Sequence, residues 1–208
     1  MKQRNFLAGA LVIAMALLIQ ACGRQLDPEE PCHFVQNHQL QRVSWKGEIP
    51  VKLSLHSSVP YKYHSAIQGA VGEWNRAFGR EVLRIELTGV NGASLPRRDG
   101  ANMIYWFKTW EPDRHREQAR TTVYWAGHRI HEADIRLNAQ DFSFYNGRHS
   151  NKDFSGVDME SLMVHELGHV LGLSHNSEQG SVMNAILPSN TLRRKPSPID
   201  LASMRCEY

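Results

Sequence analysis

The sequence predicts an α+β fold: a mixed twisted sheet of about five strands, packed against two long helices and followed by a short C-terminal helix. Three observations predict this class. Apolar and polar residues alternate in several short segments, which is the period of half-buried strands. Two longer segments place apolar residues at helical spacing. The first of these lies between two strand segments, and such a crossover favours a parallel strand pair.

The first predicted strand covers 49–55, and the residues at 57–60 are typical of a helix N-terminus. The long helix that follows ends at Gly79, a residue suited to a helix C-terminus. Its apolar face consists of Ala66, Ile67, Ala70, Val71, Trp74, Ala77 and Phe78. The remaining strand segments are 82–87, 102–107, 121–125 and 133–138.

The second long helix is predicted over 157–171, with Val164, Leu167 and Leu171 as its buried stripe. Acidic residues in its first turn complement the positive end of the helix dipole. A short last helix is predicted from Pro198 to about residue 206, and no internal repeat is present. One domain over 47–208 therefore accounts for every element.

The amino-terminal segment resembles an export signal. Lys2 and Arg4 precede an apolar run over 6–19, which is too short for a comfortable membrane span. The chain carries 24 Lys+Arg and 21 Asp+Glu, so loss of residues 1–21 leaves a net charge of about 22 − 21 = +1. That balance excludes the basic surface of a nucleic-acid-binding protein.

The apolar run ends at Leu18-Ile19-Gln20-Ala21-Cys22-Gly23, which resembles the lipobox of bacterial lipoproteins. The resemblance implies cleavage before Cys22, a lipid anchor on that residue, and a tether and arm over 22–46. A plain secretory signal with an incidental cysteine is the alternative. We therefore expect the protein in the bacterial cell envelope. Gly23 in place of Asp favours the outer membrane if the cell has two membranes.

The most informative segment runs from His165 to His175 and matches H-E-x-x-H-x-x-G-x-x-H. On a helix, His165 and His169 share one face and can present two imidazoles to one zinc ion. Glu166 lies close enough to act on a metal-activated water. A left-handed turn at Gly172 would bring His175 back as a third ligand. Three ligands leave one position open, as in catalytic zinc sites, whereas a closed structural site needs a fourth.

A methionine follows in the turn Gly180-Ser181-Val182-Met183-Asn184. Together with the extended motif, this turn resembles the metzincin metalloproteases. The Ser-Val-Met sequence and the lead-in at 158–162 are similar to the matrixin branch, which includes the matrix metalloproteases. The resemblance implies a zincin-like fold with His165, His169 and His175 as zinc ligands, Glu166 as catalytic base and Met183 as the hydrophobic floor under the metal.

The resemblance implies a zinc-dependent endopeptidase that acts on extracytoplasmic proteins or peptides. Glu166 would accept a proton from the attacking water and pass it to the departing amine. Substrate would lie along an exposed strand edge, at 121–125 or 133–137. The alternatives are an envelope maturation protease dedicated to one partner and an inactive surface-binding lipoprotein. We expect a monomer that contacts the membrane through Cys22 and binds no nucleic acid.

Two features depart from the family pattern. The residues at 184–188 do not reproduce its Pro-x-Tyr wall, so the specificity pocket should differ in shape. The family often holds additional structural Zn²⁺ or Ca²⁺ where this chain has His115, His128, His131 and His149 with Asp113 and Asp134. Their spacing matches no metal motif, and solvated loop histidines are the alternative.

Lipidation of Cys22 leaves an even pair of cysteines, Cys32 and Cys206. Export places both where disulfides persist, so we predict a bridge that ties the amino-terminal arm to the last helix. The alternative is that Cys32 acts as a latency thiol that coordinates the metal.

Overall fold

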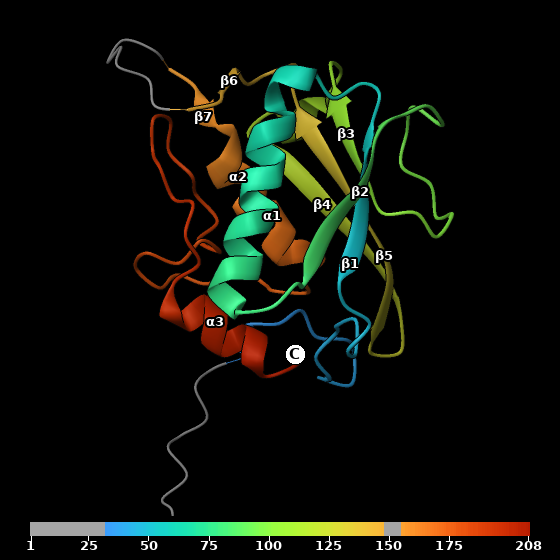
Figure 1. The fold of residues 1–208 in the computed structure, drawn as a ribbon, viewed down its shortest axis with the longest axis vertical. Coiled ribbons are helices and arrows are strands. Elements are labelled where there is room, and N and C mark those ends of the chain that lie inside the picture. The colour runs from blue at the N-terminus through green and yellow to red at the C-terminus, as the bar shows by residue number, and fades with distance from the viewer. Residues whose placement is uncertain (1–31, 148–154) are drawn as a thin grey trace, which may run out of the picture.

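The computed structural model describes residues 32–147 and 155–208 (Figure 1). The signal segment 1–21, Cys22 and His149 lie outside the described residues. The helices are α1 (His64–Phe78), α2 (Met159–Val170) and α3 (Pro198–Arg205), with 3-10 turns η1 (Tyr61–Tyr63) and η2 (Pro112–Arg114). The strands are β1 (Val51–His56), β2 (Leu83–Val90), β3 (Met103–Phe107), β4 (Ala119–Ala126), β5 (Arg129–Asn138), β6 (Phe144–Tyr145) and β7 (Val157–Asp158). No helix among the described residues is long and apolar enough to cross a bilayer.

Five strands form one mixed sheet in the order β2-β1-β3-β5-β4. The pairs β1/β2, β1/β3 and β3/β5 are parallel, and β4 pairs antiparallel with β5. This confirms the predicted α+β class and the crossover through α1 between the first two strands. Of the two segments considered for an exposed edge, only β4 lies at one, because β5 is paired on both sides. The small parallel pair of β6 and β7 was not predicted, since two-residue strands carry no period.

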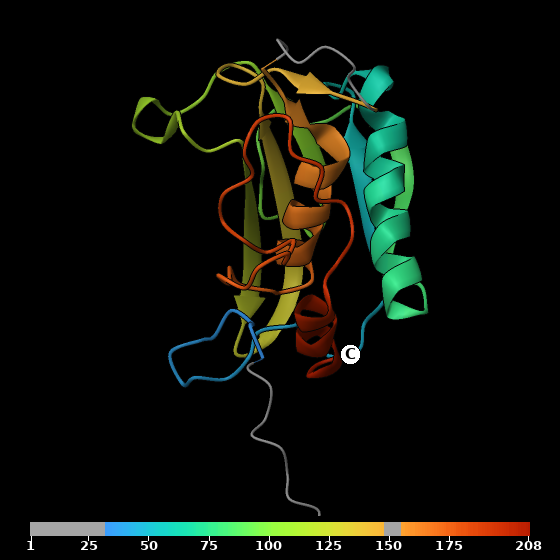
Figure 2. The same cartoon turned by 90° about the vertical axis from the view of Figure 1, so that its left-hand side faces the viewer.

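Both long helices pack on one face of the sheet (Figures 1 and 2). They are joined at Trp74, which is fully buried and donates its indole N–H to the Val164 carbonyl at 2.8 Å. Strand residues alternate between the two faces. Ile104 therefore belongs to the main core under the helices, whereas Tyr105 and Phe107 form a smaller cluster on the outer face.

Single residues at the helix ends determine where α1 ends and α2 begins. Asp158 caps α2 by accepting a hydrogen bond from Ser161 N at 2.9 Å, so the helix begins two residues later than the predicted 157. Gly79 ends α1 in the left-handed conformation (φ 81°), as predicted. These ends fix the direction in which each helix enters the core.

The described part of the amino-terminal arm packs against the domain. Phe34, Val43 and Trp45 are buried, and the Trp45 indole donates to the Val170 carbonyl at 2.7 Å. A disulfide joins Cys32 to Cys206, with Cα atoms 6.2 Å apart. It ties the arm to the chain just after α3, where the sequence predicted a bridge. The Cys32 sulfur is therefore bonded to sulfur and is not a metal ligand in this structure.

Candidate metal centre

The three motif histidines meet at one point. Their Nε2 atoms are separated by 3.2 Å (His165 to His169), 3.0 Å (His169 to His175) and 3.2 Å (His165 to His175). Nitrogen ligands at tetrahedral positions around zinc, each about 2.0–2.1 Å from the ion, lie about 3.3 Å apart. The observed spacing therefore fits one zinc ion held by all three rings.

Two of the rings are oriented by backbone carbonyls. The Nδ1 of His165 lies 2.7 Å from the Val182 carbonyl, and that of His169 lies 2.8 Å from the Leu173 carbonyl. Because a carbonyl only accepts, each Nδ1 carries the proton and each Nε2 lone pair is free for a metal. Burial, with the neighbouring His169, lowers the pKa of His165 to about 3, which keeps that ring neutral.

Gly172 turns the chain after α2. Its φ is 94°, and a Cβ there would lie 2.5 Å from the Val43 carbonyl oxygen, so only glycine fits. The turn brings His175 back to the other two histidines. Met183 lies under α2 at Gly168, where an added Cβ would come 2.3 Å from its sulfur. Met183 is fully buried.

Glu166 lies beside the histidines and is buried. The Thr121 hydroxyl of β4 donates to its Oε2 at 2.6 Å. Burial raises the pKa of Glu166, while His169 and the Thr121 hydrogen bond partly oppose that rise. Sequence reasoning missed Thr121, because a contact between residues 45 positions apart leaves no local pattern.

A cleft of about 610 Å³ opens over these groups. One wall is the segment after Met183, including Ile186 and Leu187. Arg193 holds this wall by donating to the Asn184 carbonyl at 2.8 Å and the Ile186 carbonyl at 3.1 Å. The support of this wall by Arg193 was not predicted from the sequence.

The other candidate metal residues do not join this centre. His115, His128, His131 and Asp113 are exposed, whereas Asp134 is buried on β5. Across residues 32–147 and 155–208, the three motif histidines are the only group of three or more His, Cys, Asp or Glu side chains whose ligand atoms lie within 4.8 Å of one another.

Asp134 and Glu132 form a separate pair of buried carboxylates, on the sheet face away from the helices. Met103 N–H donates to Asp134 Oδ1 at 3.0 Å, and Gly100 N–H donates to Glu132 Oε2. Each carboxylate keeps one buried oxygen without a hydrogen-bond partner. Burial, with the charges of Glu132 and Asp99, raises the pKa of Asp134 to about 7.

The donor set fits zinc: three imidazoles converge, and no fourth ligand-type side chain joins them among the described residues. Such a set leaves a coordination position open, as catalytic zinc sites do. The fold and the site together resemble those of zincin-like metalloproteases.

Comparisons with known proteins narrow the class. Residues 103–205, just under half of the chain, match the matrixin family, Peptidase M10. Metalloendoproteinase 1 from Glycine max is 37% identical over 54 residues, which cover 26% of this chain and 18% of that protein. The chain thus spans less than a fifth of the length of this relative. Both similarities support a matrixin-like zinc metalloendopeptidase.

Proposed function

We propose that the protein is a zinc-dependent endopeptidase that hydrolyses peptide bonds of extracytoplasmic proteins, with Glu166 as general base. The observation that carries the proposal is the convergence of three Nε2 atoms within 3.2 Å of one another, beside a buried glutamate in an open cleft. When bound, zinc supplies Lewis-acid polarisation of the scissile carbonyl and lowers the pKa of water.

Glu166 performs the proton transfers. Its Oε2 accepts the Thr121 hydrogen bond, so we assign proton transfer to Oε1. Glu166 takes a proton from the attacking water and later delivers it to the departing amine. Because burial raises its pKa, the carboxylate is a better base than an exposed glutamate.

The edge of β4 supports an extended substrate. This strand has no partner on its outer side within the described sheet, and its residues Thr121 and Val123 line the cleft. An extended peptide can add to such an edge through backbone hydrogen bonds. Substrate bound in this way would place a peptide bond next to Glu166.

Metal removal tests the proposal. Dialysis against 1,10-phenanthroline should abolish cleavage of unfolded casein, and one equivalent of Zn²⁺ per chain should restore it. The variant His169→Ala should lose zinc, by elemental analysis, together with activity, because two imidazoles hold the ion weakly. Exposed His131→Ala is the matched control and should retain both. Cleavage that persists in metal-free protein would refute the zinc mechanism.

We also propose that the protein is a monomer anchored to the bacterial envelope by a lipid on Cys22, in the outer membrane if the cell has two. The segment 18–23 supports this proposal. Cys22→Ala should move the protein from the membrane to the soluble fraction. Mass spectrometry of the mature amino terminus should find acyl chains on Cys22, and an unmodified cysteine there would contradict the anchor.

A further inference from the structure

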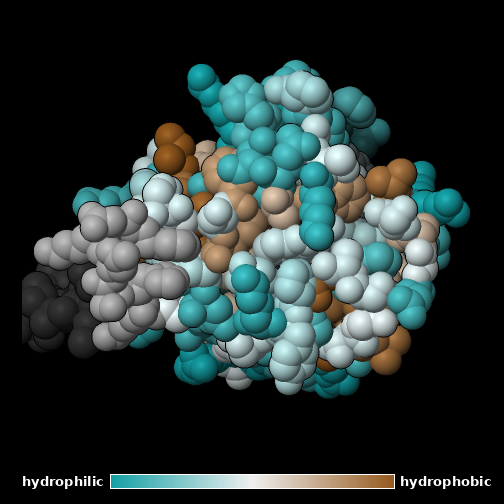
Figure 3. Space-filling view, turned by 90° about the horizontal axis from the view of Figure 1, so that it is seen from above, coloured by the Kyte–Doolittle hydropathy of each residue, from teal (hydrophilic) through white to brown (hydrophobic). Residues whose placement is uncertain are grey.

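The described part of the amino-terminal arm, residues 32–46, lies at the lower end of the molecule, beside α3 (Figures 1 and 2). There it contacts the turn after α2, which leads to the third histidine. At the upper end, by contrast, hydrophobic residues form small groups separated by hydrophilic ones, and scattered apolar residues of this kind need no function (Figure 3). The arm therefore meets the metal centre although the two are far apart in the chain.

The position of His175 depends on the turn after α2. The other two histidines are residues of α2, whereas His175 lies in the loop beyond it and is exposed. On its far side this loop is held by Asn176, whose N–H donates to the Met183 carbonyl at 3.1 Å. On its near side it is held at 172–174, and there the partner is the arm.

The arm and the turn form a short antiparallel ladder. Val35 N–H donates to the Gly172 carbonyl at 2.9 Å, and Ser174 N–H donates to the His33 carbonyl at 2.9 Å. Leu173, between the two turn positions, forms a bridge to the arm as well. The ladder therefore fixes three consecutive residues of the turn, and the last of them directly precedes the third histidine.

The same turn orients a second zinc ligand. The Leu173 carbonyl lies 2.8 Å from the Nδ1 of His169 and accepts its proton in a hydrogen bond. Partners of this kind set the ring orientation of a metal-binding histidine, so a shift of Leu173 would disturb His169. The ladder thus acts on two of the three ligands, on His175 through the chain and on His169 through its acceptor.

The carbonyls at the end of α2 also accept hydrogen bonds from distant segments. Carbonyls in the last turn of a helix have no partner within that helix. Here the Trp45 indole of the arm donates to the Val170 carbonyl at 2.7 Å, and the Tyr208 hydroxyl donates to the Leu171 carbonyl at 2.7 Å. Together with the first bond of the ladder, three consecutive carbonyls at 170–172 are held from outside α2.

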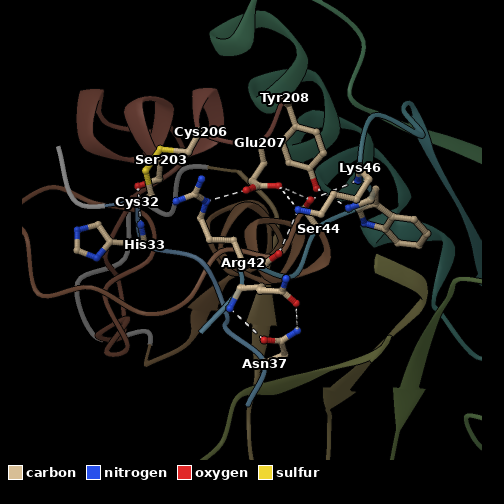
Figure 4. Close-up of polar contacts among 12 residues, drawn as sticks. Cys32, His33, Asn37, Arg42, Ser44, Lys46, Ser203, Cys206, Glu207 and Tyr208 are labelled. Atoms are coloured by element: carbon tan, nitrogen blue, oxygen red, sulfur yellow. Dashed lines mark hydrogen bonds and ion pairs between the residues drawn. A yellow bond between two sulfur atoms is a disulfide. The ribbon is translucent and has the colours of Figure 1, made fainter. Parts of the chain in front are cut away.

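A disulfide and one carboxylate fasten the arm to the chain after α3 (Figure 4). Cys32, the residue before the ladder, is bonded to Cys206. The next residue, Glu207, accepts from three side chains of the arm: Arg42 at 2.6 Å, Ser44 at 2.7 Å and Lys46 at 2.6 Å. A cross-link removes conformational freedom from the open form of the segments that it joins. The disulfide should therefore keep the ladder closed.

We propose that residues 33–35, kept in place by the Cys32–Cys206 disulfide, are positioning residues for the zinc site, because they hold the turn that places His175 and orients His169. This inference rests on the proposed zinc-dependent function and concerns how tightly the metal is bound. When only a fraction of molecules is competent to bind, the apparent Kd rises by the inverse of that fraction. A ladder open in nine molecules out of ten would therefore weaken zinc binding about tenfold.

Two variants of the full chain open the ladder in different ways. The double variant Cys32→Ser, Cys206→Ser removes the disulfide and leaves every ladder residue unchanged. Val35→Pro removes the N–H that donates to the Gly172 carbonyl, and Val35→Ala, which keeps that N–H, is its matched control. Leu83→Ala controls for a general loss of stability, because it truncates a fully buried residue of β2, at the sheet edge opposite to β4.

The first measurement is the Kd for Zn²⁺, by competition with a chromogenic chelator. Both ladder variants should bind zinc about 10- to 100-fold more weakly than wild type, the range found when outer partners of metal ligands are lost. Val35→Ala should bind zinc as tightly as wild type, and so should Leu83→Ala, although its urea unfolding midpoint falls. The second measurement is hydrogen exchange of the Ser174 amide in the zinc-free protein, which should be faster in both ladder variants.

Unchanged zinc affinity in the double cysteine variant would overturn the positioning role alone. A loss in Leu83→Ala as large as in the ladder variants would do the same, because the arm would then contribute only general stability. If Val35→Pro does not fold, the double cysteine variant decides by itself. A wild-type protein that binds no zinc would overturn the proposed function as well.

Discussion

The two faces of the sheet both bury carboxylates, but the surroundings of these groups differ. On the helix face, Glu166 accepts a hydrogen bond from Thr121 and opens on a cleft beside three histidines. On the outer face, Asp134 and Glu132 each retain a buried oxygen without a partner. Burial raises the pKa of both Glu166 and Asp134. A raised pKa therefore does not by itself identify a catalytic acid or base, and the neighbouring groups must decide.

The largest expected effect is a loss of peptide hydrolysis when the carboxylate on the helix face is replaced, but not when the one on the outer face is. Glu166→Gln should lower kcat by about 10²- to 10⁴-fold, because the amide cannot accept the proton, while zinc content stays at wild-type level. Asp134→Asn, the same isosteric change on the outer face, should leave cleavage at neutral pH within about twofold. Peptide hydrolysis and elemental analysis on both variants check this. Comparable losses in both would show that the carboxylates act together.

The next effect concerns the packing of the helix face. Gly168→Ala places a methyl group 2.3 Å from the Met183 sulfur and 3.2 Å from the Trp74 ring, so we expect about 3 kcal/mol of destabilisation. Gly72→Ala in α1 is the matched control, because its methyl meets no atom closer than 3.9 Å. That variant should gain up to about 1 kcal/mol from helix propensity. Urea unfolding measures both, and equal stabilities would mean that Met183 repacks without cost.

On the outer face, Asp134 should make the free energy of unfolding depend on pH. The folded pKa of Asp134 is about 7, above its ordinary value, so the folded protein binds the proton more tightly than the unfolded chain does. The free energy of unfolding contributed by this group therefore falls as pH rises from about 4 to 7. We expect a loss of about 2 kcal/mol, which is less than the full shift in pKa corresponds to.

Asp134→Asn should remove that dependence, because an amide stays neutral and can still accept from Met103 N–H. Urea unfolding at pH 4.5 and pH 7.5 should find the variant more stable than wild type at the higher pH only. A stability difference of the same size at both pH values would show that the effect is packing and not ionisation.

The smallest effect tests how Glu166 is held. Thr121→Val removes the hydroxyl and keeps the shape, and should lower kcat about fivefold with little change in KM, since one hydrogen bond contributes about 1 kcal/mol. Thr121→Ser restores a hydroxyl and should recover most of the rate. A Ser variant as slow as the Val variant would assign Thr121 a packing role instead.

Local patterns in the sequence predicted most of the fold. The five main strands and three helices follow from alternation, helical spacing and end residues such as Gly79. The spacing within 165–175 anticipated the meeting of three histidines, because helix geometry and one glycine turn relate them over eleven residues. Element ends were less well predicted: β4 begins at Ala119, two residues before the predicted start, where its pairing with β5 continues.

Contacts between segments that are distant in the chain could not be predicted from the sequence. The sequence by itself determined the types of the main elements and the convergence of the three histidines, because both depend on backbone periods and short spacings. Only the tertiary structure decided that Thr121 contacts Glu166, that Arg193 supports the cleft wall and that Val35 of the arm lines the cleft. These contacts join residues far apart in the chain, and which of them form depends on how the whole core packs.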